Sequence, residues 1–454
     1  MNIAILGYDR QGKSAYQHWS SPDNQLTICD QNDHIVVPDD CETQLGDDYL
    51  SNLDRFDLLV RTPGLHPHKI VAANPDALDI LEKVTTVTDE FLKVCPSRNI
   101  IGVTGTKGKG TTSTLIATML REAGKRVHLG GNIGLAPLDM LSGAGLMNET
   151  LPDTVQSIQK DDWVVLELAN FQLIDIKHSP HIAVCLMVVP EHLDWHTDID
   201  EYLRAKQQLF AHQTEHDIAI YHPHNNRSRH LATTSLGMHI PYLTPPGAHI
   251  EQDAIVIDGN TICQLDDVAL PGAHNLENVC AAVTVARHVT QDTTALQRVI
   301  TTFTGLPYRL QYVGAVDDVS FYNDSFGTTP ETAQVAIAAM TQPTVLILGG
   351  SDKKADYSEL AATIKNSPLI THVITIGETG SAIKTALLER DYTSISESHN
   401  QTMIDIVATA FDRAEKPGAV LLSPACASFD MFDNYIERGD QFNQAVQALA
   451  PAGE

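Results

Sequence analysis

The first segment of this chain with recognisable chemistry is a glycine-rich loop that contains two lysines and several hydroxyl groups. It follows a short apolar run at residues 100–103 and precedes an amphipathic helix that ends at Gly124. Its residues are Gly105, Thr106, Lys107, Gly108, Lys109, Gly110, Thr111 and Thr112. Backbone N–H groups of such a loop can approach phosphate oxygens, and the helix N-terminus adds about half a positive charge. The pattern predicts a nucleoside-triphosphate site with Lys109 on the phosphates and a hydroxyl on a metal ion.

The spelling of this loop departs from the usual G-x-x-x-x-G-K-[ST] pattern. Gly105 is only three residues before Gly108, and Gly110 stands where a serine or threonine is expected. A plain glycine-rich turn between a strand and a helix is therefore the alternative. In a phosphate site with this spelling, we expect the metal-binding hydroxyl to be that of Thr111.

Glu167 is an acidic residue inside an apolar run, residues 163–168. Burying a carboxylate is costly unless it is paired or bound to a metal. An acidic residue at the end of a strand beside a phosphate loop is a common Mg²⁺ ligand. We therefore predict that Glu167 binds Mg²⁺, with a paired structural glutamate as the alternative.

Two histidines follow the apolar run at residues 182–189, in the segment Pro-Glu-His-Leu-Asp-Trp-His. His192 and His196 are four residues apart, so on a helix they would lie on one face and could bind zinc. The segment leaves a strand at a proline, however, which makes helical geometry doubtful. A hard cation beside the phosphate loop fits His192 better, and simple capping at a strand end is a third possibility.

Lys206 lies on the apolar stripe of the helix predicted over residues 198–210. Apolar residues are expected along that stripe, and lysine is seldom fully buried without a partner. Its side chain could extend past the core to water. The alternative is that the amine serves a site.

These residues must be positioned by an α/β fold. Short β-branched runs alternate with amphipathic stretches along most of the chain, as in buried parallel strands separated by helices. The loops after such strands are the usual ligand sites. Proline- and glycine-containing boundaries near residues 93–98 and 305–309 divide the chain into three domains, residues 1–94, 95–304 and 305–454. Residues 236–270 have little helical pattern and predict a few irregular strands.

Composition excludes several classes of protein. The chain has 454 residues, and 30 Lys and Arg against 57 Asp and Glu give a formal net charge of −27. Such a chain has no general attraction for nucleic acid or an anionic membrane. No run approaches the roughly 18 apolar residues of a membrane span, and no signal peptide is visible. Seven scattered cysteines, an odd number, argue against a disulfide framework. We expect a cytoplasmic monomer.

Taken together, the motifs resemble the Mur ligase superfamily, ATP-dependent amide-forming ligases of peptidoglycan precursors and folates. Further segments that resemble family motifs are GAHNLEN at 272–278, GLPYR at 305–309, NDS at 323–325 and GGSDK at 349–353. The segments GNIG at 131–134 and LLSPACASFD at 421–430 resemble the branch that adds D-glutamate. The resemblance implies a Rossmann-like N-terminal domain, a P-loop-type central ATPase domain and a Rossmann-like C-terminal domain.

The resemblance also implies substrates, cofactors and residue roles. ATP would phosphorylate the carboxylate of UDP-N-acetylmuramoyl-L-alanine, and the amine of D-glutamate would attack the acyl phosphate. The residues implied at ATP are Gly105–Thr112 in the loop, together with Asn278, Arg309 and Asp324. Two Mg²⁺ ions are implied, one at Thr111 and Glu167, the other at His192 and a carbamylated Lys206. The residues implied at the other substrates are Asp30, Asn132 and His192 for the nucleotide sugar, and Thr328, Lys353, Ser428, Phe429 and Tyr435 around the amino acid.

Two departures from the family pattern keep alternatives open. Gly110 makes the loop read G-K-G-T, which resembles the folylpolyglutamate synthetase branch. Phe326 stands where the family has a lysine after Asn-Asp-Ser. A missing cation there allows a different incoming amino acid, or a nucleotide-binding regulator that has lost its chemistry.

Overall fold

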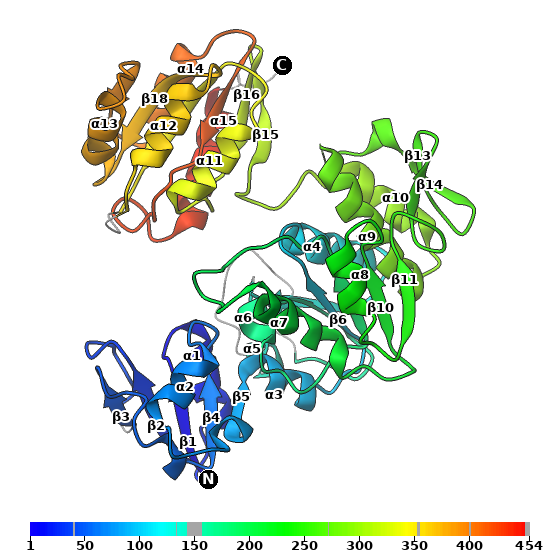
Figure 1. Ribbon diagram of the computed structural model, residues 1–454. Helices are drawn as coiled ribbons and strands as arrows, with labels where there is room; N and C mark the ends of the chain where they lie inside the picture. The colour runs from blue at the N-terminus through cyan, green and yellow to red at the C-terminus, as the bar shows by residue number, and fades with distance from the viewer. Residues whose placement is uncertain are drawn as a thin grey trace. The chain divides into compact units, whose positions relative to one another are not determined.

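The computed structural model describes residues 1–39, 41–132, 134–142, 157–270, 272–351, 355–398 and 401–449 (Figure 1). The chain separates into two compact units, Met1–Phe303 and Thr304–Glu454. Both units contain parallel sheets with helices between the strands, which confirms the predicted α/β class. None of the helices in the described ranges has the length and apolar character needed to cross a membrane.

The first unit begins with a five-stranded parallel sheet in the order β3-β2-β1-β4-β5. Its strands are β1 (Asn2–Leu6), β2 (Gln25–Asp30), β3 (Glu42–Leu45), β4 (Leu58–Arg61) and β5 (Val84–Thr86). Its helices are α1 (Arg10–Trp19), α2 (Pro67–Ala73) and α3 (Val87–Val94). The turn from β1 to α1 needs glycine, because a Cβ on Gly12 would lie 2.0 Å from the Gly7 carbonyl oxygen. Close strand–helix approach of this kind is typical of nucleotide-binding Rossmann turns.

A second, six-stranded parallel sheet in the same unit has the order β11-β10-β9-β6-β8-β7. Its strands are β6 (Ile100–Thr104), β7 (Val127–Gly131), β8 (Trp163–Glu167), β9 (Ile182–Cys185), β10 (Ile218–Tyr221) and β11 (Met238–Pro241). The helices of this part are α4 (Lys109–Glu122), α5 (Asp139–Ser142), α6 (Asn170–Leu173), α7 (Ile199–Ala211), α8 (Asn226–Ala232), α9 (Ala273–Val289) and α10 (Thr293–Thr302). Because β6 lies between β8 and β9, the loops after these three strands meet at one edge.

The irregular strands expected between residues 236 and 270 include a small antiparallel sheet. It consists of β12 (His249–Glu251), β13 (Ala254–Ile257) and β14 (Asn260–Gln264). The apolar run at residues 182–189 was predicted as one strand, but β9 ends at Cys185. The residues after Cys185 leave the sheet because they hydrogen bond to the glycine-rich loop instead.

The two sheets of the first unit share a hydrophobic core. One cluster of buried side chains contains Ile3, Val60 and Phe91 from the N-terminal part together with Leu166 and Ala183 from the six-stranded sheet. Continuous apolar packing of this kind stabilises the two parts as one body.

A buried ion pair reinforces that junction. The guanidinium of Arg61, at the end of β4, donates from both Nε and Nη2 to the carboxylate of Asp175, each at 2.7 Å. It also donates to the carbonyl oxygens of Thr62, Leu65 and Phe171. Every donor direction of this buried cation is therefore used, which is the condition under which a buried charge is tolerated.

The second unit is a six-stranded sheet in the order β15-β16-β20-β17-β18-β19, parallel except for β15. Its strands are β15 (Gln311–Val316), β16 (Val319–Asn323), β17 (Thr344–Gly349), β18 (Ile370–Ile376), β19 (Ile395–Glu397) and β20 (Gly418–Leu422). Its helices are α11 (Pro330–Ala338), α12 (Ser358–Asn366), α13 (Gly380–Leu388), α14 (Met403–Arg413) and α15 (Tyr435–Leu449). The loops after β16, β20 and β17 meet at one edge because these strands are neighbours.

Candidate functional site

The glycine-rich loop joins β6 to α4 as the sequence predicts. Gly108 has φ of +84°, and a Cβ there would lie 2.3 Å from Asn278 Oδ1, so only glycine fits against that side chain. Lys109 is the first residue of α4, and its Nζ donates to the carbonyl oxygens of Gly105 (3.1 Å) and Thr106 (2.9 Å). The loop and the helix N-terminus thus combine backbone N–H groups with a lysine, which suits phosphate oxygens.

The hydroxyls of the loop have different surroundings. Thr112 is buried, and its Oγ1 donates to Asn278 Oδ1 at 3.3 Å, which ties α4 to α9. Asn278 Nδ2 in turn donates to Asn275 Oδ1 at 3.1 Å. Asn278 therefore positions the loop as well as facing the pocket beside it. Thr111, by contrast, is only half-buried.

The segment after β9 holds the glycine-rich loop in place through hydrogen bonds to Thr106. Thr106 N donates to the Met187 carbonyl oxygen at 2.9 Å, and Thr106 Oγ1 donates to the Val189 carbonyl oxygen and accepts from Val189 N, both at 2.9 Å. The same hydroxyl lies 2.8 Å from Tyr202 Oη. These bonds fix the loop's backbone and explain why β9 is shorter than its apolar pattern.

Lys206 does not reach water. Its side chain is 1% exposed, and its Nζ donates to the Gly105 carbonyl oxygen at 2.9 Å and lies over the Tyr202 ring, 4.7 Å from the centroid. Burial, together with the nearby Lys109 cation, lowers the pKa of the Lys206 amine to about 7. A substantial neutral fraction at physiological pH makes this amine a nucleophile.

Glu167 ends β8 directly beside the loop, paired in register with Val103 of β6. Its carboxylate is buried, and Oε1 accepts from Asn132 Nδ2 at 2.9 Å. Among the described residues, Glu167 Oε2 has no hydrogen-bond partner. A buried carboxylate oxygen left in that state beside a phosphate loop fits a Mg²⁺ ligand.

The two histidines of the zinc alternative face different partners. His192 has φ of +56° and a partly exposed ring 3.5 Å from Glu191. His196 is buried, with Nε2 2.7 Å from Asn170 Nδ2 and Nδ1 3.2 Å from Glu201 Oε2. Both ring nitrogens of His196 are therefore used within the protein, and the segment is not the helix that a shared zinc site would require.

His66 and His196 meet at Glu201, and the ligand-type atoms of the three side chains lie within 4.8 Å of one another. His66 Nδ1 accepts a hydrogen bond from His68 N at 3.0 Å, so the proton of the neutral ring lies on Nε2. That proton points to Glu201 Oε2, 3.2 Å away. The cluster is thus a satisfied hydrogen-bond network between α2 and α7.

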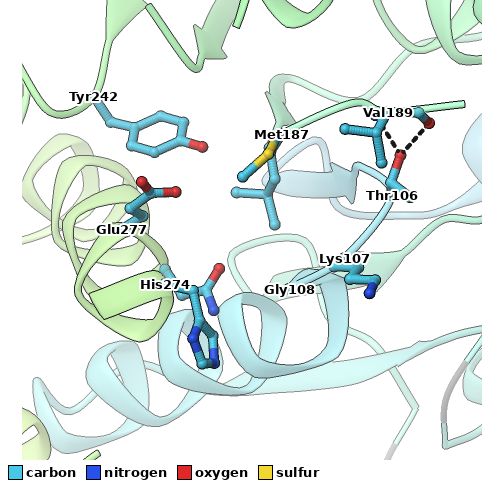
Figure 2. A pocket seen from close by; sticks show the side chains of 10 residues that line it. Thr106, Lys107, Gly108, Met187, Val189, Tyr242, His274 and Glu277 are labelled. Carbon is cyan, nitrogen blue, oxygen red and sulfur yellow. Dashed lines mark hydrogen bonds between the residues drawn. The ribbon is translucent and has the colours of Figure 1, made fainter. Parts of the chain in front are cut away.

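A pocket opens beside the glycine-rich loop (Figure 2). It is lined by Thr106, Lys107, Gly108, Leu186, Met187, Val189, Tyr242, His274, Glu277 and Asn278. Apolar side chains after β9 form one wall, and the first turns of α9 form another. Tyr242 and Glu277 lie at the opposite end from Thr106 and Lys107. The pocket suits a nucleoside whose phosphates extend to the loop.

In the N-terminal part, Asp30 and the first turn are tied to each other. Asp30 Oδ2 accepts from Tyr8 N at 2.7 Å, so this carboxylate shapes the turn that precedes α1. Arg10 then donates to the carbonyl oxygens of Gly134 (2.8 Å) and Asn132 (3.3 Å). The structure therefore brings the N-terminal turn, Asn132 and Glu167 into one connected network.

In the second unit, Asp324 follows β16 and is buried. Its Oδ2 accepts from Ser423 Oγ at 2.7 Å and its Oδ1 accepts from Leu310 N at 3.1 Å, while burial raises its pKa to about 6. Arg309 is exposed, and its guanidinium lies over the Phe326 ring, 4.1 Å from the centroid. Phe326, which stands where the family has a lysine, thus holds the Arg309 side chain in place.

The remaining residues predicted at the amino acid lie in the same unit, except that Lys353 falls outside the described residues. Ser428 is buried in the loop after β20, whereas Phe429 is 72% exposed. Thr328 is half-buried in the loop after β16. Tyr435 begins α15, and its ring meets the edge of Phe326 with 5.2 Å between centroids. These loops share one edge of the sheet.

Arg438 is a buried residue of this unit that sequence reasoning missed. Its guanidinium donates to the Ser325 carbonyl and hydroxyl oxygens and to the carbonyl oxygens of Cys426 and Ala427, at 2.9–3.1 Å. It thereby joins the loop after β16 to the loop after β20. No local pattern on α15 marks this arginine for the role. One partner, Ser325, lies more than 100 residues earlier, and the other two, Cys426 and Ala427, lie in the loop after β20.

Tyr242, His222 and Glu277 were also not predicted. Glu277 lies inside the GAHNLEN motif, so its position beside Asn278 was the only signal. Tyr242 and His222 follow β11 and β10, and only the strand order brings them to α9.

Two known protein-domain families match this chain. Residues 103–286 match the Mur ligase middle domain, and residues 308–426 match the Mur ligase, glutamate ligase domain. The chain is 36% identical over 428 residues to the UDP-N-acetylmuramoylalanine–D-glutamate ligase of Acetivibrio thermocellus, covering 90% of this chain and 86% of that protein. It is 33% identical to the protein of the same name from Clostridium tetani, covering 89% and 86%.

Solved structures share the fold at low sequence identity. UDP-N-acetylmuramate-alanine ligase from Thermotoga maritima aligns with a TM-score of 0.54 at 15% identity, covering 99% of both chains. MurF ligase from Thermotoga maritima in complex with ADP aligns with a TM-score of 0.53 at 14% identity, covering 99% of this chain and 95% of that one.

Proposed function

Since the chain belongs to the Mur ligase family, among its UDP-N-acetylmuramoylalanine–D-glutamate ligases, we propose that it uses ATP to join D-glutamate to UDP-N-acetylmuramoyl-L-alanine in peptidoglycan precursor synthesis. Residues 1–94 bind the UDP part, residues 95–304 bind ATP, and residues 305–454 bind D-glutamate. The enzyme works as a monomer in the cytoplasm. The observation that most supports this chemistry is the glycine-rich loop flanked by buried Glu167 and Lys206.

The reaction has two steps. The carboxylate of the acceptor attacks the γ-phosphorus of ATP, a P–O bond to ADP breaks, and an acyl phosphate forms. The amine of D-glutamate then attacks the acyl carbon, loses a proton, and expels inorganic phosphate from a tetrahedral intermediate. Three anionic groups meet in this reaction, so positive charge must be supplied locally. The loop N–H groups, the N-terminus of α4 and Lys109 supply it at the phosphates.

Two Mg²⁺ ions, when bound, would neutralise charge on the phosphate oxygens. Glu167 and Thr111 would hold one ion, and the unpartnered Oε2 of Glu167 is the observation that supports this. His192 and a carbamate on Lys206 would hold the other. Asn132 keeps the Glu167 carboxylate in place through its bond to Oε1. Asn132 is also one of the residues that we propose contact the nucleotide sugar.

Lys206 becomes an anionic ligand by carbamylation. Its neutral amine attacks CO₂, a C–N bond forms, and one proton is released, which leaves a carbamate whose N–H can still donate to the Gly105 carbonyl. The pKa of about 7 favours the neutral amine that this step needs. We expect Lys206→Ala to abolish turnover, with no rescue by added CO₂. Near-normal turnover of this variant would contradict the carbamate.

The second unit supplies the remaining contacts. Arg309 binds phosphate oxygens and Asp324 the ribose, while Ser428, Thr328 and Lys353 bind the carboxylates of D-glutamate. Phe429 and Tyr435 border the same loops. Guanidinium–phosphate and hydroxyl–carboxylate pairs are the usual chemistry for such ligands.

The deciding experiment is a substrate panel. Phosphate release is measured with ATP and each pairing of acceptor (UDP-N-acetylmuramoyl-L-alanine or a folate) with amino acid (D-glutamate, L-glutamate or L-lysine). We expect release only when the UDP-linked acceptor and D-glutamate are both present. Release with folate, or with L-glutamate alone, would overturn the proposal. A Lys109→Met variant provides the inactive control.

A further inference from the structure

The end of the pocket that lies away from the glycine-rich loop contains one carboxylate, that of Glu277 (Figure 2). Glu277 is in the first turns of α9, and its side chain is 37% exposed. Beside it stands Tyr242, which is almost completely buried. A charged acceptor at one end of a mostly apolar pocket is the feature that orients a ligand there.

His222 fixes the orientation of this carboxylate. His222 Nδ1 accepts from His224 N at 3.2 Å, so in the neutral ring the proton lies on Nε2. That Nε2–H faces Glu277 Oε2, 3.4 Å away. Burial lowers the pKa of the His222 ring, which keeps it neutral and leaves the negative charge of Glu277 uncompensated by it.

The other oxygen of Glu277, Oε1, has no partner in the part of the chain that the structure describes. Leu186, Met187 and Val189 form an apolar wall suited to the face of a flat base. Thr106 and Gly108 at the other end receive the phosphates. A nucleoside triphosphate with its phosphates on the loop therefore directs the edge of its base to Tyr242 and Glu277.

We propose that Glu277, oriented by His222, selects adenine by accepting a hydrogen bond from the exocyclic amine of the base. This inference rests on the proposed ATP site and adds a specificity determinant to it. The edge of adenine presents an N–H₂ donor where guanine presents a carbonyl oxygen. A carboxylate attracts the donor and repels the carbonyl, so Glu277 favours ATP and disfavours GTP.

The test uses the full chain and the variant Glu277→Gln. Dissociation constants for ATP and GTP are measured by calorimetry, without acceptor or amino acid, so that binding is separated from turnover. Glutamine can donate its amide N–H₂ to the guanine carbonyl. We expect Glu277→Gln to lower the preference for ATP over GTP by about tenfold, through weaker ATP binding and stronger GTP binding. Glu251→Gln, an exposed glutamate on β12 of the same unit, is the matched control and should leave the preference unchanged.

Two outcomes would overturn the inference. If Glu277→Gln keeps the wild-type ATP-to-GTP ratio while its thermal unfolding matches that of the wild type, Glu277 does not read the base. If a misfolded variant obscures the result, Glu277→Asp supplies the second test, because it keeps the charge and should retain preference for ATP. A wild-type chain that binds no ATP at all would instead remove the proposed function itself.

Discussion

The buried amine of Lys206 makes the stability of the folded chain depend on pH. The pKa of its folded-state amine is lowered to about 7, from an ordinary value of 10.5, mainly because the side chain is buried. Between these two pH values the unfolded chain binds more protons than the folded chain. The free energy of unfolding must therefore rise with pH across this window, and fall as the pH drops to 7.

We expect Lys206→Met to remove most of that pH dependence. The measurement is denaturant unfolding at several pH values between 7 and 10, in CO₂-free buffer so that the carbamate does not form. The variant should be more stable than the wild type at pH 7, because the cost of burying a charged amine is gone. Lys125→Met, an exposed lysine after α4, should leave the wild-type slope unchanged. Equal slopes for wild type and Lys206→Met would contradict the buried-amine account.

Phe326 gives a second prediction at the scale of the residue. Its ring lies 4.1 Å from the Arg309 guanidinium, and cation–π contacts at such partly exposed sites are worth about 0.5–1 kcal/mol. If Arg309 binds ATP, Phe326→Leu should raise the KM for ATP about two- to fivefold, because the arginine loses its support. Phe326→Tyr keeps the ring and should keep the KM. An unchanged KM in the leucine variant would show that the stack is irrelevant to ATP.

At the scale of the elements, Arg438 determines how two loops of the second unit are held. A guanidinium on α15 joins the loop after β16 to the loop after β20, and a lysine cannot reproduce its fork of donors. We expect Arg438→Lys to lower the free energy of unfolding of this unit by about 2–4 kcal/mol. The KM for D-glutamate should rise in parallel, since the second loop contains Ser428.

The measurement combines thermal unfolding with steady-state kinetics. Arg413→Lys, at an exposed position at the end of α14, is the matched control and should change neither quantity. Unaltered stability in Arg438→Lys would mean that the two loops hold their positions without the guanidinium.

The elements also show what could be predicted from the sequence. Buried parallel strands were visible because their apolar runs are short and β-branched, and β8 occupies nearly all of the apolar run at residues 163–168. Strand β9 was overestimated, since the apolar residues after Cys185 pack under the glycine-rich loop instead of joining the sheet. Lys206 could be identified because it is a lysine on the apolar stripe of a single helix, so the pattern is local in the sequence. His222 and Arg438 could not be found, because each acts through partners that only the strand order brings near.

At the scale of the whole molecule, the distribution of hydrophobic cores predicts how the chain unfolds. One buried cluster joins the N-terminal sheet to the six-stranded sheet, and two separate clusters fill the second unit. We therefore expect two calorimetric transitions, because the first unit unfolds as one body and the second unfolds separately. Scanning calorimetry of the full chain measures this directly.

Two variants assign the transitions. Asp175→Asn weakens the partner of buried Arg61 and should lower only the transition of the first unit. Arg438→Lys should lower only that of the second. Three transitions would mean that the N-terminal sheet is independent despite the core that it shares with the larger sheet.

The shared core also determines where this chain can be cut. A break between Phe303 and Thr304 leaves every buried cluster on one side or the other, so each fragment should be expressible and well behaved in solution. A break near residue 94 would separate Val87, Phe91 and Leu92 from their apolar neighbours on β8 and β9. Both fragments would then expose large hydrophobic surfaces to water and should aggregate. We therefore expect two fragments that can be produced separately, residues 1–303 and 304–454, and not three fragments with one major sheet each.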